Sequence, residues 1–213
     1  MDYSYTSNTI KEEERVILDI VRNRDGLEIG GPSKCNNIYN NINKLDNITI
    51  FKTGEREYNI KNKKLGIEYV KDTTNLTNIK NNTYDFILVS NTLEYIANPI
   101  KAIKEWLRIL KQNGFIIMIF DNISETDDNK FHLKKIIENY EKNIGEDDLS
   151  VLPSILSKSK TNETFIRECL NNYHLRKIEH FNYNEKLLSG IIEYLDLGVF
   201  YNNKSDRLVY IIR

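Results

Sequence analysis

The sequence has little cysteine and no apolar run long enough to cross a bilayer. Cys35 and Cys169 are the two cysteines among 213 residues, and neither belongs to a CxxC pair. They therefore predict neither a zinc site nor a framework of disulfide bonds, and this usage is typical of a reducing compartment. The apolar run FIIMIF, residues 115–120, is far shorter than the roughly 20 residues that a membrane-spanning helix needs.

The chain also lacks an excess of charge of either sign. Lysine and arginine number 30, aspartate and glutamate 31, and the formal net charge is -1. This balance provides no overall attraction to nucleic acid or to an anionic membrane, although a local basic patch remains an alternative. The opening stretch, MDYSYTSNTIKEEER, is polar and lacks the apolar core of a secretory signal. We therefore expect a cytoplasmic protein without a membrane partner, in the host cytoplasm if the source is viral.

Asparagine, isoleucine and lysine are abundant instead, as in NNIYNNINK at residues 36–44. The codons of an AT-rich genome produce this bias, so it indicates a viral or AT-rich microbial source and carries no information about mechanism. The length suits one hydrophobic core and usually not two. Because the chain shows no internal repeat and no linker, we predict a single domain over residues 1–213.

The apolar patterns of the first half predict strands that alternate with helices. Residues 84–91, YDFILVSN, form an almost continuous apolar run, which is typical of a strand buried on both faces. The amphipathic segment 99–114 begins with proline and ends with glycine, as a helix does, and FIIMIF follows at once. Strand, helix and strand with short joins predict a mostly parallel sheet. The predicted strands are 27–30, 47–51, 67–72, 84–91 and 115–120, and the predicted helices are 9–24 and 99–114.

The second half has a different pattern. Residues 121–160 are polar and contain one predicted helix, HLKKIIENYEKNIG at 132–145, so we interpret them as a lid or insertion outside the sheet. Two further helices are expected at 162–173 and 184–197. The tail contains GVFY and RLVYIIR, joined by YNNKSD, which has the chemistry of a turn. This pattern predicts a hairpin that closes the sheet with an antiparallel strand.

The stretch GLEIGGPSK, residues 26–34, suggests a ligand site at a strand end. Gly30 and Gly31 have no side chains, so their backbone amides can approach a ligand closely. Glu28 supplies a carboxylate that suits a cation or a hydroxyl and repels a phosphate. The spacing matches neither GxGxxG nor GxxxxGK[ST], which disfavours nicotinamide dinucleotides and the phosphates of ATP. The alternative is an ordinary tight turn in which Glu28 is solvated.

Two later segments complete a recognisable pattern. DTTNL, residues 72–76, follows a predicted strand, and YDFILVSNTLEYIANPIKAIKEWLRILKQNGFIIMIF spans residues 84–120. Together with GLEIGGPSK, these segments resemble the class I S-adenosylmethionine-dependent methyltransferases, in the branch called type 11. The resemblance covers residues 26–121. ENYEKNIGEDDL and LNNYHLRKIEHF are similar to a bacterial and viral subgroup found near glycan-synthesis genes.

The resemblance implies a fold, a cofactor and a set of binding residues. The fold would be an α/β Rossmann-like three-layer sandwich, with a seven-stranded, mostly parallel sheet, an antiparallel C-terminal strand and a small helical lid. The cofactor would be S-adenosylmethionine, leaving as S-adenosylhomocysteine. The residues implied to face or shape its site are Glu28, Gly30, Gly31, Pro32, Ser33, Glu55, Asp72, Thr73, Ser90, Asn91 and Glu94. Glu55 is offered for the ribose-binding acid, whose usual position is not obvious in this sequence.

The acceptor chemistry is less defined than the cofactor site. A hydroxyl acceptor needs a general base, and the candidates in order are His180, His132 and Asp121. The chain has Asn91 and Tyr95 where the family often has histidine, which puts the acceptor chemistry in doubt. The acids of residues 125–128 are an alternative site for a divalent ion, but a solvated loop is the preferred interpretation and we predict no metal site.

We therefore expect an enzyme that methylates a hydroxyl of a sugar, nucleotide-sugar or glycan. The resemblance to the glycan-associated subgroup carries this expectation. One rival is an RNA cap methyltransferase, which the neutral charge disfavours. Another is an inactive methyltransferase-like protein that serves as a binding partner or scaffold. A homodimer through the C-terminal strands also remains an alternative.

Overall fold

The computed structural model describes residues 11–33, 37–49, 56–60, 63–70, 72–121, 129–158, 162–205 and 207–213, and the structural statements below concern these residues. Its strands are β1 Asp25–Ile29, β2 Lys44–Thr49, β3 Arg56–Ile60, β4 Lys63–Val70, β5 Tyr84–Ser90, β6 Leu110–Phe120, β7 Val199–Lys204 and β8 Leu208–Ile212. Its helices are α1 Glu12–Val21, α2 Pro99–Ile109, α3 Asn129–Glu141, α4 Leu152–Lys158, α5 Glu163–Leu170, α6 Asn172–Leu175 and α7 Glu185–Tyr194, with short 3-10 turns η1 Ile38–Asn40 and η2 Leu93–Tyr95.

The strands form one sheet in the order β3-β4-β2-β1-β5-β6-β8-β7. The five strands from β4 to β6 run parallel. The last strand, β8, lies antiparallel between β6 and β7. The predicted Rossmann-like, mostly parallel sheet with an antiparallel C-terminal strand is confirmed. All seven predicted strands are present, and β3 is an additional edge strand that pairs antiparallel with β4.

The sheet separates two hydrophobic layers. On one face, Ile87 and Val89 of β5 pack with residues of α2 and α7. On the other face, Phe86 and Leu88 pack with residues of α1 and η1. Because successive side chains of a strand point to opposite faces, β5 needs apolar residues at nearly every position. Burial on both faces therefore explains the apolar run at residues 84–91.

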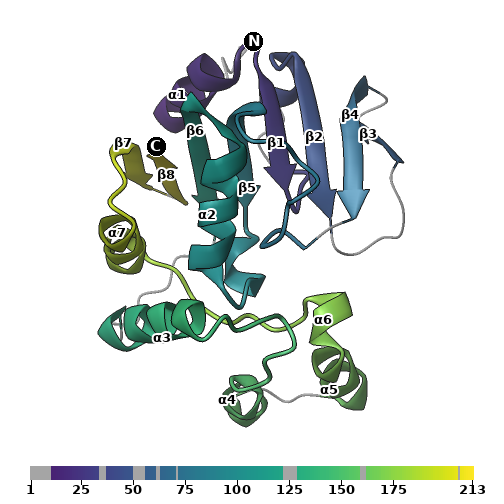
Figure 1. Ribbon diagram of the computed structural model, residues 1–213, viewed down its shortest axis with the longest axis vertical. Helices are drawn as coiled ribbons and strands as arrows, with labels where there is room; N and C mark the ends of the chain where they lie inside the picture. The colour runs from purple at the N-terminus through teal and green to yellow at the C-terminus, as the bar shows by residue number, and fades with distance from the viewer. Residues whose placement is uncertain are drawn as a thin grey trace, which may run out of the picture.

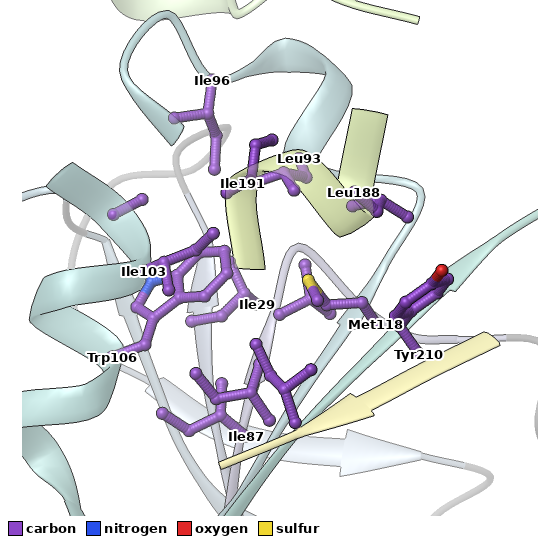
Figure 2. Close-up of a cluster of buried hydrophobic side chains, with 14 of the residues drawn as sticks. Ile29, Ile87, Leu93, Ile96, Ile103, Trp106, Met118, Leu188, Ile191 and Tyr210 are labelled. Carbon is purple, nitrogen blue, oxygen red and sulfur yellow. The ribbon is translucent and has the colours of Figure 1, made fainter. Parts of the chain in front are cut away.

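The layer beneath α2 and α7 supports the end of the sheet where ligands of α/β proteins bind. Figure 2 shows Ile29, Ile87, Met118 and Trp106 gathered in this layer. Trp106 is fully buried and its indole Nε1 donates a hydrogen bond to Thr73 Oγ1 at 2.8 Å. The core thereby fixes the loop that follows β4.

The helices α3, α4, α5 and α6 gather beyond the carboxyl ends of the parallel strands (Figure 1). The predicted helix at 132–145 is present as α3, whereas α4 lies within the polar stretch where one helix alone was expected. The predicted extent of the helix at 99–114 is wrong at its end. It stops at Ile109 because Leu110 pairs with Tyr84 and continues directly into β6. None of the described helices is both long and apolar enough to cross a bilayer.

The close pairing of β1 with β5 leaves no room for a side chain at Gly26. Gly26 pairs with Phe86, and a Cβ atom at Gly26 would collide with the far end of the phenyl ring. We expect Gly26→Ala to lower the free energy of unfolding by about 1–3 kcal/mol, as overpacked cores do. Urea unfolding followed by the fluorescence of the single tryptophan, Trp106, measures the effect.

The matched control is Gly198→Ala. A Cβ atom there would lie 3.7 Å from the carbonyl oxygen of Arg213, which is an ordinary contact. We expect its free energy of unfolding to stay within about 0.5 kcal/mol of the parent. Equal unfolding midpoints for the two variants would contradict the tight β1–β5 packing.

Candidate functional site

A cavity of about 280 Å³ lies at the carboxyl ends of the parallel strands, where open α/β sheets bind their ligands. Its volume is near the lower end of the range of about 300–1,000 Å³ for small-molecule sites. Its floor includes Ile29 and Ile96, which also belong to the core layer of Figure 2. The lining residues are Ile29, Gly30, Ile48, Thr73, Ser90, Asn91, Thr92, Tyr95, Ile96, Glu146 and Arg176.

Four of the residues predicted to bind a cofactor meet in this cavity. Gly30 follows β1, Thr73 follows β4, and Ser90 and Asn91 lie at the end of β5. Parallel strands bring these positions to one edge although they are far apart in the chain. The other predicted positions, Glu28, Gly31, Pro32, Ser33, Asp72 and Glu94, do not line the cavity within the described part of the chain, and Glu55 lies outside the described residues.

The two adjacent glycines are needed for different reasons. Gly30 has a φ angle of +82°, and a Cβ atom there would collide with the side chain of Thr92. Thr92 Oγ1 cannot move away freely, because it donates to the carbonyl oxygen of Ser90 at 2.8 Å. A Cβ atom at Gly31 would collide with the carboxylate of Glu28. Only glycine fits either position without a shift of its neighbours.

Glu28 lies beneath this loop rather than at its surface. It is fully buried, so the alternative of a solvated Glu28 is wrong. Its Oε1 atom accepts hydrogen bonds from the backbone N–H of Ser33 at 2.9 Å and from the hydroxyl of Tyr39 at 2.8 Å. Burial, and then the charge of Glu28, raise the pKa of Tyr39 well above its usual value, so the tyrosine remains a donor. These bonds hold residues 30–33 in place below the cavity.

Asn91 connects the ends of β5 and β6. Its Nδ2 donates to Asp121 Oδ2 at 3.0 Å, and its Oδ1 accepts from the backbone N–H of Asp121 at 2.7 Å. Its φ angle of 47° lies in the left-handed region, which asparagine tolerates better than most residues. The local backbone therefore favours asparagine at a position where the related pattern often has histidine.

A second cavity, of about 820 Å³, adjoins the first, and Tyr95 lines both. It brings together two of the predicted catalytic residues, His132 and His180, from opposite ends of the helical segment. Asp121, the third candidate, lines neither cavity in the described structure. The residues around the second cavity are Tyr95, His132, Lys135, Ser150, Val151, Ser154, Ile155, Phe165, Lys177, Glu179, His180, Phe181 and Asn182.

The surroundings of His180 make it a weak base. The residue is 5% exposed, and burial lowers the pKa of its imidazole to about 4. The charge of Asp148 opposes this change, while Arg176 and Lys135 add to it. His180 is therefore neutral at pH 7 and gains a proton only in acid. Its backbone N–H donates to the carbonyl oxygen of Glu94 at 2.8 Å, which anchors the segment to η2.

The pKa of Glu94 is shifted in the opposite direction, upward. Burial raises the pKa of its carboxyl to about 7, and the nearby charges of Glu179 and Asp121 contribute to the rise. Its Oε2 atom is buried and has no hydrogen-bond partner among the described residues. The sequence indicated Glu94 only as part of a motif. Its raised pKa was not predictable, because Asp121 and Glu179, whose charges contribute to the rise, are remote from Glu94 in the chain.

Comparisons with known proteins agree with this arrangement. Residues 39–118 match the model of a family described as a methyltransferase domain, a range that contains Thr73, Ser90 and Asn91. No curated protein matches the chain. Among solved structures, a SAM-dependent methyltransferase from Aquifex aeolicus is 12% identical with a TM-score of 0.54, over 95% of this chain and 90% of that one. A SAM-dependent methyltransferase from Methanosarcina mazei is 15% identical with a TM-score of 0.54, over 92% and 94%.

A third structure, described as a Zn-dependent alcohol dehydrogenase from Rhodobacter sphaeroides, is 10% identical with a TM-score of 0.57, over 95% of this chain and 89% of that one. At such identities the likeness concerns the fold alone, and the methyltransferase match covers residues 39–118. The match over residues 39–118 and the shared fold together support a class I S-adenosylmethionine-dependent methyltransferase. S-adenosylmethionine is the cofactor of enzymes of that class. The cavity suits this cofactor. Gly30 has no side chain, so its backbone is accessible to a ligand, and the hydroxyl-bearing residues Thr73 and Ser90 line the cavity.

The raised pKa of Glu94 predicts a pH dependence of stability. The folded methyltransferase binds the Glu94 proton more tightly than the unfolded chain does, so its contribution to stability is greatest below about pH 4.5 and is lost as the pH rises to about 7. We expect Glu94→Gln to be more stable than the parent at pH 8, by an amount on the order of 3 kcal/mol, and to resemble the parent near pH 4.5.

Thermal unfolding of parent and variant between pH 4.5 and pH 8 measures this difference. Glu193→Gln, at an exposed position of α7, is the control and should follow the parent at every pH. A constant difference between Glu94→Gln and the parent across the range would contradict the raised pKa.

Proposed function

We propose that the methyltransferase transfers the methyl group to a hydroxyl of a carbohydrate-type acceptor, such as a sugar, a nucleotide-sugar or a glycan. The observation that supports this proposal is the second cavity, which adjoins the first at Tyr95. It combines the aromatic rings of Phe165 and Phe181 with serine, lysine and glutamate side chains. Sugars offer an apolar face and many hydroxyls, so such a mixed lining suits them.

The first cavity is the proposed cofactor site. Gly30 would let the backbone approach the methionine part, while Ser90 and Asn91 would line the region of the reacting sulfur. Thr73 would contact the adenine end, next to Asp72. Glu28, Gly31, Pro32 and Ser33 would shape the loop, in keeping with the hydrogen bonds beneath it.

Methyl transfer from a sulfonium is an in-line displacement in which the cofactor supplies an activated methyl and its own leaving group. The protein mainly positions the acceptor and excludes water. Tyr95 is suited to positioning, because it lines both cavities and its hydroxyl donates to Glu179 Oε1 at 2.8 Å. Within the predicted lid, α3 and α4 would cover the site, and α5 and α6 add to the same end of the molecule.

Among the candidate bases, His132 suits the acceptor cavity best. It is half-buried, lines the cavity and lies edge-on to the ring of Phe181, with 6.5 Å between ring centroids. His180, the first choice from the sequence, is disfavoured because its pKa is lowered to about 4. Asp121 is engaged with Asn91. We therefore place His132 first, as the group that accepts the hydroxyl proton.

A side chain at position 30 should strongly weaken cofactor binding. Gly30→Val places a branched side chain where the φ angle is +82° and Thr92 leaves no room. We expect calorimetric titration with S-adenosylhomocysteine to show at least about 100-fold weaker binding, because the backbone must move away from the cofactor. Gly198→Val, distant from the cavity, is the control and should bind like the parent. Parent-like binding by a folded Gly30→Val protein would contradict the proposed cofactor site.

Removal of the proposed base should affect the reaction and not cofactor binding. With labelled S-adenosylmethionine and a panel of nucleotide-sugars, free sugars and RNA, we expect transfer to a sugar hydroxyl. His132→Gln should lower kcat by about 100- to 10,000-fold, the usual contribution of a general base. The affinity for S-adenosylhomocysteine should stay unchanged. Methylation of RNA alone, or an unaltered kcat, would contradict the proposal.

A further inference from the structure

A buried ion pair from outside the βαβ core lines the proposed cofactor cavity. Glu146 lies between α3 and α4, and Arg176 follows α6. Their residues are 4% and 6% exposed, and both line the cavity. Arg176 Nη1 lies 3.0 Å from Glu146 Oε2. Neither residue was among the predicted site residues, although both lie in the segments that resemble the glycan-associated subgroup.

A set of hydrogen bonds fixes both residues in place. The backbone N–H of Ala97 donates to Glu146 Oε1 at 3.0 Å. Asn172, which is 1% exposed, donates through Nδ2 to the carbonyl oxygen of Glu146 at 3.0 Å and accepts from the N–H of Ile178 at 2.9 Å. Two chain segments on either side of Arg176 are thus connected to the loop that carries Glu146.

The pair retains hydrogen-bonding capacity. Although Arg176 Nη1 and Glu146 Oε2 are close, neither atom makes an aligned hydrogen bond to any described residue. Buried polar atoms are hydrogen-bonded in the great majority of cases, so such exceptions require an explanation. Burying two charges is also costly unless further hydrogen bonds satisfy them. A polar ligand in the cavity that both side chains line would supply these bonds.

The position of the pair indicates which part of the cofactor it meets. Arg176 Nη2 lies 3.9 Å from Asp72 Oδ1, at the end of the cavity where Thr73 and Ile48 also lie. Asp72 Oδ1 already accepts from the N–H and the hydroxyl of Thr74, both at 2.9 Å. Among the described residues that line the cavity, Glu146 provides the carboxylate.

We propose that Glu146 and Arg176 recognise the nucleoside part of the cofactor. Glu146 accepts a hydrogen bond from an N–H or O–H donor of adenosine, and Arg176 donates to a nucleoside acceptor. The helical segment after α3 thereby supplies the acid that the core sequence lacks at an obvious position. This assignment rests on the cofactor site proposed above and is independent of the acceptor.

Calorimetric titration of Glu146→Gln with S-adenosylhomocysteine tests the assignment. We expect affinity to fall by about 10- to 100-fold, as for the loss of a hydrogen bond to a charged group. Titration with S-inosylhomocysteine, which lacks the adenine amino group, identifies the donor. If Glu146 accepts from the amino group, the variant loses the preference for adenine; if it accepts from a ribose hydroxyl, both ligands weaken equally. Either result supports the proposal.

Three further variants make the outcome decisive. The double variant Glu146→Gln/Arg176→Gln removes both charges, so it provides a second measurement if Glu146→Gln folds poorly. Glu163→Gln, at an exposed position of α5, should bind like the parent. Gly30→Val reports on the cofactor site itself. If Gly30→Val loses binding while the folded Glu146 variants keep the affinity of the parent, the cofactor site stands, the pair only anchors the segment, and the proposal is overturned.

Discussion

The turn after β1 is the constraint on which the site depends. The backbone at Gly30 takes a left-handed conformation against Thr92, and the buried carboxylate of Glu28 occupies the space beside Gly31. This arrangement brings backbone to the carboxyl edge of the sheet without side chains in front of it, which is the condition for close contact with a ligand. The cavity exists because β5 ends at the same edge, where Asn91 and Asp121 exchange hydrogen bonds.

Electrostatics divides the site into two environments. Burial raises the pKa of Glu94 to about 7 and lowers that of His180 to about 4, because it disfavours the charged form of each group. In the first cavity the charges of Glu146 and Arg176 remain together as a pair.

Local patterns were sufficient for the central sheet and for part of the site. The apolar run of β5, the proline and glycine around α2, and the order of strands and helices all follow from short-range periodicity, so the parallel sheet was predictable. The same patterns gave wrong or missing predictions where pairing with a neighbouring strand, and not the local sequence, decides the secondary structure. Leu110 begins a strand because Tyr84 lies beside it, and β3 forms because β4 offers an edge.

The sequence by itself determined the positions that depend on backbone chemistry: Gly30 at the strand end, and Thr73, Ser90 and Asn91 after their strands. Each lies in a short segment whose resemblance to a family motif was enough to locate it. Only the tertiary structure decided the roles of Glu28, His180, Glu146 and Arg176. Glu28 is a buried acceptor because Ser33 and Tyr39 lie over it, and His180 is neutral because it is buried. The meeting of Glu146 with Arg176 arises from helices packed beyond the sheet, and long-range packing of this kind leaves no periodic signal in the chain.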